Sequence, residues 1–72
     1  MSKYDYWVQL NDLGTARLHV EVAKRTLEDC IKYERQHSSD PDTSLEYEVL
    51  LRSTEHTLDQ IDNMLEAVKA LM

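Results

Sequence analysis

Three histidines are the first candidates for site chemistry, because imidazole binds transition metals and titrates near neutral pH. His37 falls in a polar segment, whereas His19 and His56 fall in two different helical segments. No two of them are four residues apart, and none stands beside a cysteine at zinc-site spacing. The spacing therefore favours ordinary surface or interface histidines, and we expect no metal site.

The remaining reactive groups do not form a catalytic pattern either. Cys30 has no cation fixed beside it in the sequence, which favours a small buried side chain over a reactive thiol. Asp59, Asp62 and Glu66 stack into an acidic ridge, but a pair of packed helices offers no concave pocket for a substrate. A solvated ridge, on which Lys69 pairs with Glu66, is the simpler interpretation. We therefore expect neither an enzyme nor a bound cofactor.

The length of 72 residues and the net charge of −6 limit the size of the core and the choice of partners. An acidic chain without a basic patch is not expected to bind nucleic acid or an anionic membrane surface. Cys30 is the only cysteine, no apolar leader is visible, and no window is apolar enough to span a membrane. These features predict a cytoplasmic protein. Below ~80 residues a lone core supplies only about 3–5 kcal/mol, so a partner is often needed.

Residues 1–72 are expected to form one all-α domain, a coiled-coil-like antiparallel hairpin of two helices. Apolar periodicity predicts the first helix over 15–36 and the second over 43–71, joined by a polar turn at 37–42. Residues 1–14 form a lead-in with roughly helical spacing.

Two boundaries stay open at this stage. Gly14 either weakens a continuous helix by about 1 kcal/mol or separates a short first turn from the main helix. At the second helix, either Asp40 is the N-cap with Pro41 at the first helical position, or a capping box at 43–46 starts the helix one step later.

Each helix carries an apolar stripe that should face the other. The first stripe is predicted to be narrow and rich in small residues: Leu13, Ala16, Val20, Ala23, Leu27 and Cys30. The second follows a heptad pattern: Tyr47, Leu51, Thr54, Leu58, Ile61, Leu65, Val68 and Met72. We expect Leu13, Val20, Leu27 and Cys30 to pack against Leu51, Leu58, Ile61 and Leu65.

The second helix keeps its charges on one ridge, which leaves a wide uncharged flank. The seven charged residues after residue 47 are three or four apart: Glu48, Arg52, Glu55, Asp59, Asp62, Glu66 and Lys69. A helix that packs on one partner needs an apolar stripe of only ~100°. The flank therefore predicts a second surface that binds another protein or a second copy, or one that the N-terminal segment covers.

The residues predicted to bind a partner come from this flank and from the N-terminal aromatics. From the flank they are Leu50, Thr57, Met64, Ala67 and Leu71. Tyr4, Tyr6 and Trp7 cluster three aromatics within four residues, either as a hydrophobic cap on the open end of the hairpin or as interface anchors. Of these, Tyr6 and Trp7 are the predicted contact residues.

The second helix resembles that of a small co-chaperone family of bacterial type III secretion, the YscE/EscE/SsaE type. The residues that carry the resemblance follow a polar turn: Asp40-Pro41, Tyr47, Leu50-Leu51, Leu58, Ile61 and Leu65. The resemblance covers roughly residues 15–70. It implies a cytosolic protein that binds a tetratricopeptide-like chaperone, the pair keeping the needle subunit monomeric before export.

The type III needle subunit itself is the alternative, since it has a Ser-Asp-Pro turn followed by Glu-Tyr and a Trp near its N-terminus. Here Ser39-Asp40-Pro41, Glu46-Tyr47 and Trp7 look similar. Needle subunits continue into an apolar tail that contains Asn and often Phe, whereas this chain ends Ala67-Val68-Lys69-Ala70-Leu71-Met72 and has no Phe. The departure favours the co-chaperone. A self-associating hairpin that forms a four-helix bundle is the other structural alternative.

Overall fold

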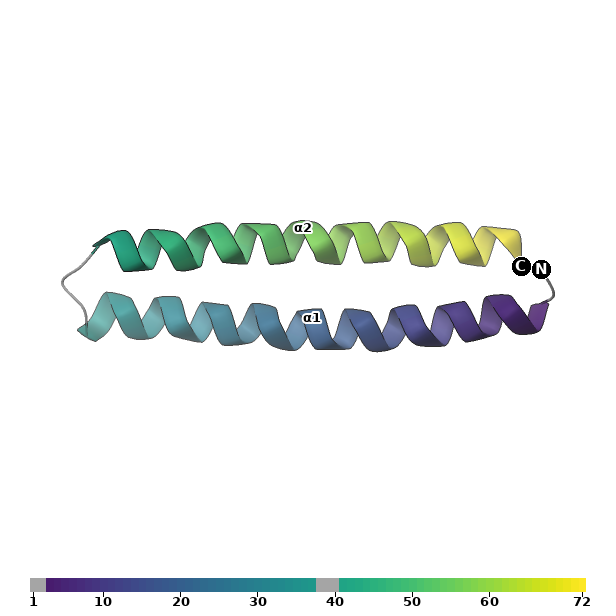
Figure 1. The fold of residues 1–72 in the computed structure, drawn as a ribbon, viewed down its shortest axis with the longest axis horizontal. Coiled ribbons are helices and arrows are strands. Elements are labelled where there is room, and N and C mark those ends of the chain that lie inside the picture. The colour runs from purple at the N-terminus through teal and green to yellow at the C-terminus, as the bar shows by residue number, and fades with distance from the viewer. Residues whose placement is uncertain (1–2, 38–40) are drawn as a thin grey trace.

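The protein is an antiparallel hairpin of two long helices, as the sequence predicts. The computed structural model describes residues 3–37 and 41–72. Helix α1 spans Lys3–His37 and helix α2 spans Pro41–Leu71, and the two run side by side over their whole length (Figure 1). The Cα trace measures 55 × 14 × 11 Å, so the hairpin is a rod only one layer thick.

Of the two alternatives left open at Gly14, the structure has the continuous helix, so α1 begins at Lys3 instead of residue 15. Gly14 lies inside the helix, and its backbone does not adopt a positive φ. Tyr6, Leu10 and Leu13 are half-buried at 4-3 spacing, so this segment has its own contact with the end of α2. Such packing outweighs the roughly 1 kcal/mol by which a glycine weakens a helix.

The helices also come closer to the turn than predicted. Helix α1 ends at His37 instead of residue 36, and α2 begins at Pro41 instead of residue 43. A proline at the first helical position fits because its fixed φ suits the helix and its missing N–H would have no intrahelical partner there. Asp40, the predicted N-cap, lies outside the described residues.

The seam of α2 is the predicted one. Every residue of the predicted stripe except the terminal Met72 is buried or half-buried: Tyr47, Leu51, Thr54, Leu58, Ile61, Leu65 and Val68. The steps alternate between four and three residues, which keeps a side chain on the same side of the helix throughout.

The seam of α1 differs from the prediction at every second contact position. Ala16 and Ala23 are exposed, and the half-buried or buried residues of 4-3 spacing are Tyr6, Leu10, Leu13, Arg17, Val20, Lys24, Leu27, Ile31 and Glu34. Arg17 and Lys24 therefore take the places assigned to two alanines. Their long aliphatic stems cover apolar surface while the charged ends reach water or an acid, which an alanine cannot do.

The resulting core is thin. Among the described residues, the buried apolar side chains are Ile31, Leu58 and Val68. The radius of gyration is 16.4 Å, against about 11 Å for a compact chain of this length. A single seam between two helices thus carries most of the stability of the isolated chain.

Leu58→Ala should destabilise the hairpin by about 2–5 kcal/mol, because Leu58 is only 8% exposed and its removal leaves a cavity in the seam. Urea unfolding followed by circular dichroism measures the change. Leu18→Ala is the matched control, since Leu18 is 58% exposed and should change stability by less than about 1 kcal/mol. Equal effects of the two substitutions would contradict the seam.

Gly14→Ala should stabilise the protein by about 1 kcal/mol, because alanine has less backbone entropy to lose on forming a helix. Apart from the neighbouring residues and the backbone of the helix itself, no atom lies within 4 Å of the place where the new Cβ would stand, so the substitution creates no clash. Thermal unfolding should show a midpoint several degrees higher. A lower midpoint would mean that α1 is not continuous through residue 14.

Candidate protein-binding face

The two sides of the seam differ in charge. On one side, which we call the charged side, Glu21, Glu28 and Arg35 of α1 lie beside the Glu48, Glu55 and Asp62 positions of α2. The Arg35 guanidinium forms an ion pair with Glu48 across the helices. Arg17 donates a hydrogen bond of 2.7 Å from Nε to Asp62 and also contacts Glu21 at 3.3 Å. Arg17–Asp62 and Arg35–Glu48 therefore join the two helices at two separate points along the charged side.

The hydrogen bond to Asp62, together with the charges of Asp62 and Glu21, raises the pKa of the Arg17 guanidinium above its ordinary value. Arg17 therefore remains a cation under all ordinary conditions. The acidic ridge predicted as wholly solvated is accordingly wrong at Asp62, which is half-buried and paired. Asp59 and Glu66 are exposed as expected, and the predicted Lys69–Glu66 pair is present at 3.8 Å.

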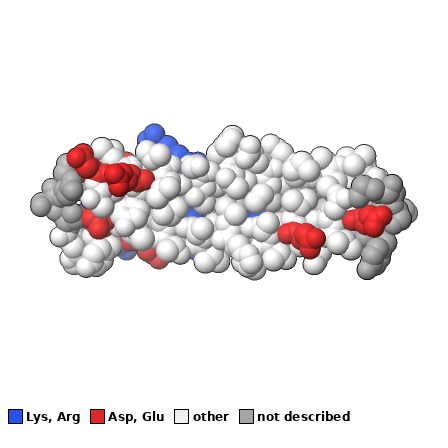
Figure 2. Space-filling model, in the orientation of Figure 1, with Lys and Arg blue, Asp and Glu red and all other residues white. Residues whose placement is uncertain are grey.

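The opposite side of the seam has no charge in either of the two rows that border it. We call it the neutral face and define it by its residues, which are Ala16, Ala23 and Cys30 of α1 and Leu50, Thr57, Met64 and Leu71 of α2. Residues within each row are seven apart, so each row stays on one side of its helix. Figure 2 shows this side, with a white middle and acidic side chains toward the ends.

The α2 row of the neutral face exposes large apolar side chains. Leu50 and Met64 are each 53% exposed, and Leu71 is 65% exposed. Thr57 is half-buried, and its hydroxyl donates a 3.0 Å hydrogen bond to the Ser53 carbonyl of the same helix. Because the hydroxyl is used within the helix, the threonine adds little polarity to the surface.

Four of the predicted contact residues, Leu50, Thr57, Met64 and Leu71, therefore lie together on the neutral face, and the other three do not belong to it. Ala67 is exposed one row further out on α2. Tyr6 is half-buried on the α1 seam. Trp7 is 62% exposed. It precedes Arg35 by four heptads, so it lies on the same side of α1 as Arg35, which is the charged side. The side chain of Tyr4 lies outside the described residues.

The α1 row is the part of the face that sequence reasoning missed. Ala16, Ala23 and Cys30 were assigned to the seam, but Cys30 is half-buried at its edge and the two alanines are exposed. The missed signal is the alternative stripe through Arg17, Lys24 and Ile31, which keeps 4-3 spacing from residue 6 to residue 34.

Two shallow hollows lie along the seam near the neutral face. One, of about 310 Å³, is lined by Gln9, Asp12, Leu13 and Met64. The other, of about 350 Å³, is next to Cys30, with Tyr33 and Tyr47 in its wall. Each hollow also has acidic side chains in its wall, Asp12 in the first and Asp29 and Glu34 in the second.

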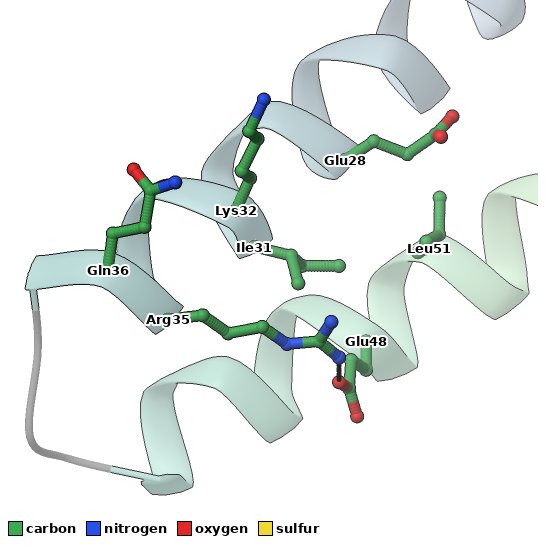
Figure 3. A pocket seen from close by; sticks show the side chains of 7 residues that line it. All are labelled: Glu28, Ile31, Lys32, Arg35, Gln36, Glu48 and Leu51. Atoms are coloured by element: carbon green, nitrogen blue, oxygen red, sulfur yellow. Dashed lines mark hydrogen bonds and ion pairs between the residues drawn. The ribbon is translucent and has the colours of Figure 1, made fainter.

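A third hollow, of about 460 Å³, opens on the charged side near the turn (Figure 3). Ile31 and Leu51 form its floor, and Glu28, Lys32, Arg35 and Glu48 contribute two acids and two bases to its wall. Ligand pockets are mostly apolar with a few polar groups. This hollow is instead lined by charges that balance one another, with the Arg35–Glu48 pair across it.

The histidines do not converge. His19, His37 and His56 are all exposed, and the His37 ring lies 4.4 Å from that of Tyr33. Within residues 3–37 and 41–72, no three His, Cys, Asp or Glu side chains are grouped as a metal site would require. No helix in the described part of the chain combines the length and the apolar character needed to cross a membrane.

Comparison of the chain with protein-family models, with curated proteins and with solved structures finds no match. The geometry of the hairpin and the chemistry of its two sides therefore carry the functional argument.

Asp62→Asn should lower the urea midpoint of unfolding, because it removes the charge that pairs with Arg17 across the seam. Glu66→Gln is the control, since the ion pair of Glu66 is with Lys69 of its own helix and is longer, at 3.8 Å. The difference between the two variants should shrink in 1 M NaCl, where exposed pairs are screened. Equal midpoints at low salt would show that the cross-helix pair does not stabilise the register.

Proposed function

We propose that this chain is a protein-binding hairpin that docks its neutral face on a helical partner, and that it acts as a cytoplasmic co-chaperone of type III secretion. In this role it binds a tetratricopeptide-like chaperone, and the pair keeps a needle subunit monomeric before export. The resemblance of the second helix supports the identity of the partner, and the neutral face supports the mode of binding.

The amount of exposed surface is the observation that carries the proposal. The accessible surface is 5490 Å² for 8.5 kDa, whereas a compact monomer of that mass exposes about 4,700 Å². The excess of roughly 800 Å² equals what each partner buries in a standard protein interface. Leu50, Met64 and Leu71 expose three large apolar side chains on one uncharged side, while Leu18, Val22, Leu45 and Val49 are exposed elsewhere on the rod.

The shape of the hairpin also suits a helical-repeat partner. Stacked helical repeats form an extended concave surface. A straight rod 55 Å long and 14 Å wide can lie along such a surface and present one side to it. The uncharged side can be buried in this way without desolvating an acid, which would cost several kcal/mol.

Met64→Glu or Leu71→Glu should weaken binding to the tetratricopeptide-like chaperone of a type III secretion needle at least 100-fold, because either places a charge where water must leave. Co-expression and pull-down, followed by titration calorimetry, measure the loss. Asn63→Glu is the matched control, since it adds the same charge at an exposed residue on the outer side of α2.

Asp59→Asn and Glu66→Gln on the exposed ridge should change the affinity less than about fivefold. All variants should retain the helical circular dichroism of the parent chain. If the ridge variants abolish binding while Met64→Glu binds normally, the neutral face is not the docking surface. If the purified parent chain forms fibres, the needle-subunit alternative replaces the proposal.

A further inference from the structure

We infer that a second copy of this chain covers the neutral face when no other partner does. In the resulting four-helix dimer, α2 of each copy lies over α1 of the other. The connected ends of the two hairpins, by which we mean the ends where α1 is joined to α2, lie together. This inference rests on the shape of the face and goes beyond the proposed function, because it gives the same face a second occupant.

The two rows of the neutral face are complementary in size. The ion pairs Arg17–Asp62 and Arg35–Glu48 show which turns of the two helices lie level across the hairpin. Seven-residue steps along antiparallel helices then keep the rows in register. Each small side chain lies level with a larger one, in the pairs Ala16 with Met64, Ala23 with Thr57, and Cys30 with Leu50.

A two-fold axis along the rod places the large row of one copy over the small row of the other. Leu50 of the second copy then lies over Cys30 of the first, beside the hollow of about 350 Å³. Leu71 of the second copy lies level with Gln9, beside the hollow of about 310 Å³. Large side chains that meet small ones across two layers interdigitate, as packed cores require.

The other symmetric pairing is less favourable. With the connected ends at opposite ends of the dimer, α2 lies over α2, and Leu50 of one copy meets Leu71 of the other. Alanine then meets alanine between the two α1 helices. The two α2 helices would be held apart by their large side chains, while the two α1 helices would have to approach closely to bring their alanines into contact. Helices in a bundle instead pack at similar separations of 8–10 Å.

Charge also allows the first pairing. Each copy carries a net charge of −6, so two copies approach most easily through the neutral face, whose two rows contain no acid. The nearest acids, Asp12, Asp29 and Glu34, lie in the walls of the two hollows beside it. In the rows just outside the neutral face, the level pairs across the dimer are Asp12 with Ala67, His19 with Gln60, Thr26 with Ser53 and Tyr33 with Glu46. None of these pairs sets one acid against another.

The rod as a whole also has surface to spare for a dimer. Its accessible surface exceeds that of a compact monomer by roughly 800 Å², and a standard specific interface buries about 800 Å² on each partner. The dimer would give the chain the second layer that its single seam lacks.

A size-exchange cycle tests the pairing by sedimentation equilibrium of the full chain. The parent should sediment as a dimer at millimolar concentration, and Met64→Glu as a monomer of 8.5 kDa. Ala16→Met and Met64→Ala should each weaken the dimer at least tenfold, and the double variant should recover to within about threefold of the parent. Asn63→Glu, on the outer side of α2, should leave the dimer intact.

The distance between spin labels distinguishes the two symmetries. With Cys30→Ala as background, a nitroxide on Gln36→Cys should give an inter-copy distance of about 30 Å or less if the connected ends lie together. Opposite ends would put the labels about 50 Å apart at 1.5 Å per residue, and that result would overturn the pairing.

A parent chain that remains a monomer at millimolar concentration would overturn the self-association itself. That outcome would leave the chaperone pull-down unaffected. Conversely, a dimer of the stated symmetry that fails to bind the chaperone would uphold this inference and contradict the proposed function.

Discussion

The packing of α1 against α2 along one seam is the constraint on which the rest of the structure depends. Most domains bury their apolar faces between two or more layers, whereas two helices have only one surface in common. Ile31, Leu58 and Val68 are buried in this seam, and the rod is 11 Å thick. The chain therefore folds with apolar side chains left over, and the arrangement of the seam decides where they lie.

The placement of Arg17 and Lys24 in the α1 seam makes the two sides of the hairpin unlike. Because these long side chains occupy contact positions, the neighbouring Ala16 and Ala23 turn to one edge and join the apolar α2 row. The acids gather on the other edge, where Asp62 pairs with Arg17. A single choice of contact residues thus produces both the charged side and the neutral face.

A face of this kind suits a protein that exchanges partners. It is uncharged, so it can be buried without stranding an acid, and it has large side chains in one row and small ones in the other. Self-pairing would keep Leu50, Met64 and Leu71 away from water until a better partner arrives. The two proposals are compatible in this sense, because a dimer held by modest area can open to bind a larger helical surface.

The sequence by itself determined the hairpin, the register of α2 and the uncharged flank. In α2 the leucines and the charges indicate the same heptad, while the start of the helix at Pro41 was only one of the two alternatives that the sequence left open. Residues Leu50, Thr57, Met64 and Leu71 could therefore be placed on one side in advance.

Only the tertiary structure decided how α1 is used. Two stripes share Leu13, Val20 and Leu27, and composition alone favours the one completed by alanines. The choice of Arg17 instead depends on Asp62 of the other helix, which no pattern within α1 can show. The N-terminal segment was also decided by the tertiary structure. The helix propensity of Gly14 is a local property, whereas the contact that Tyr6 and Leu10 make with the end of α2 depends on the other helix.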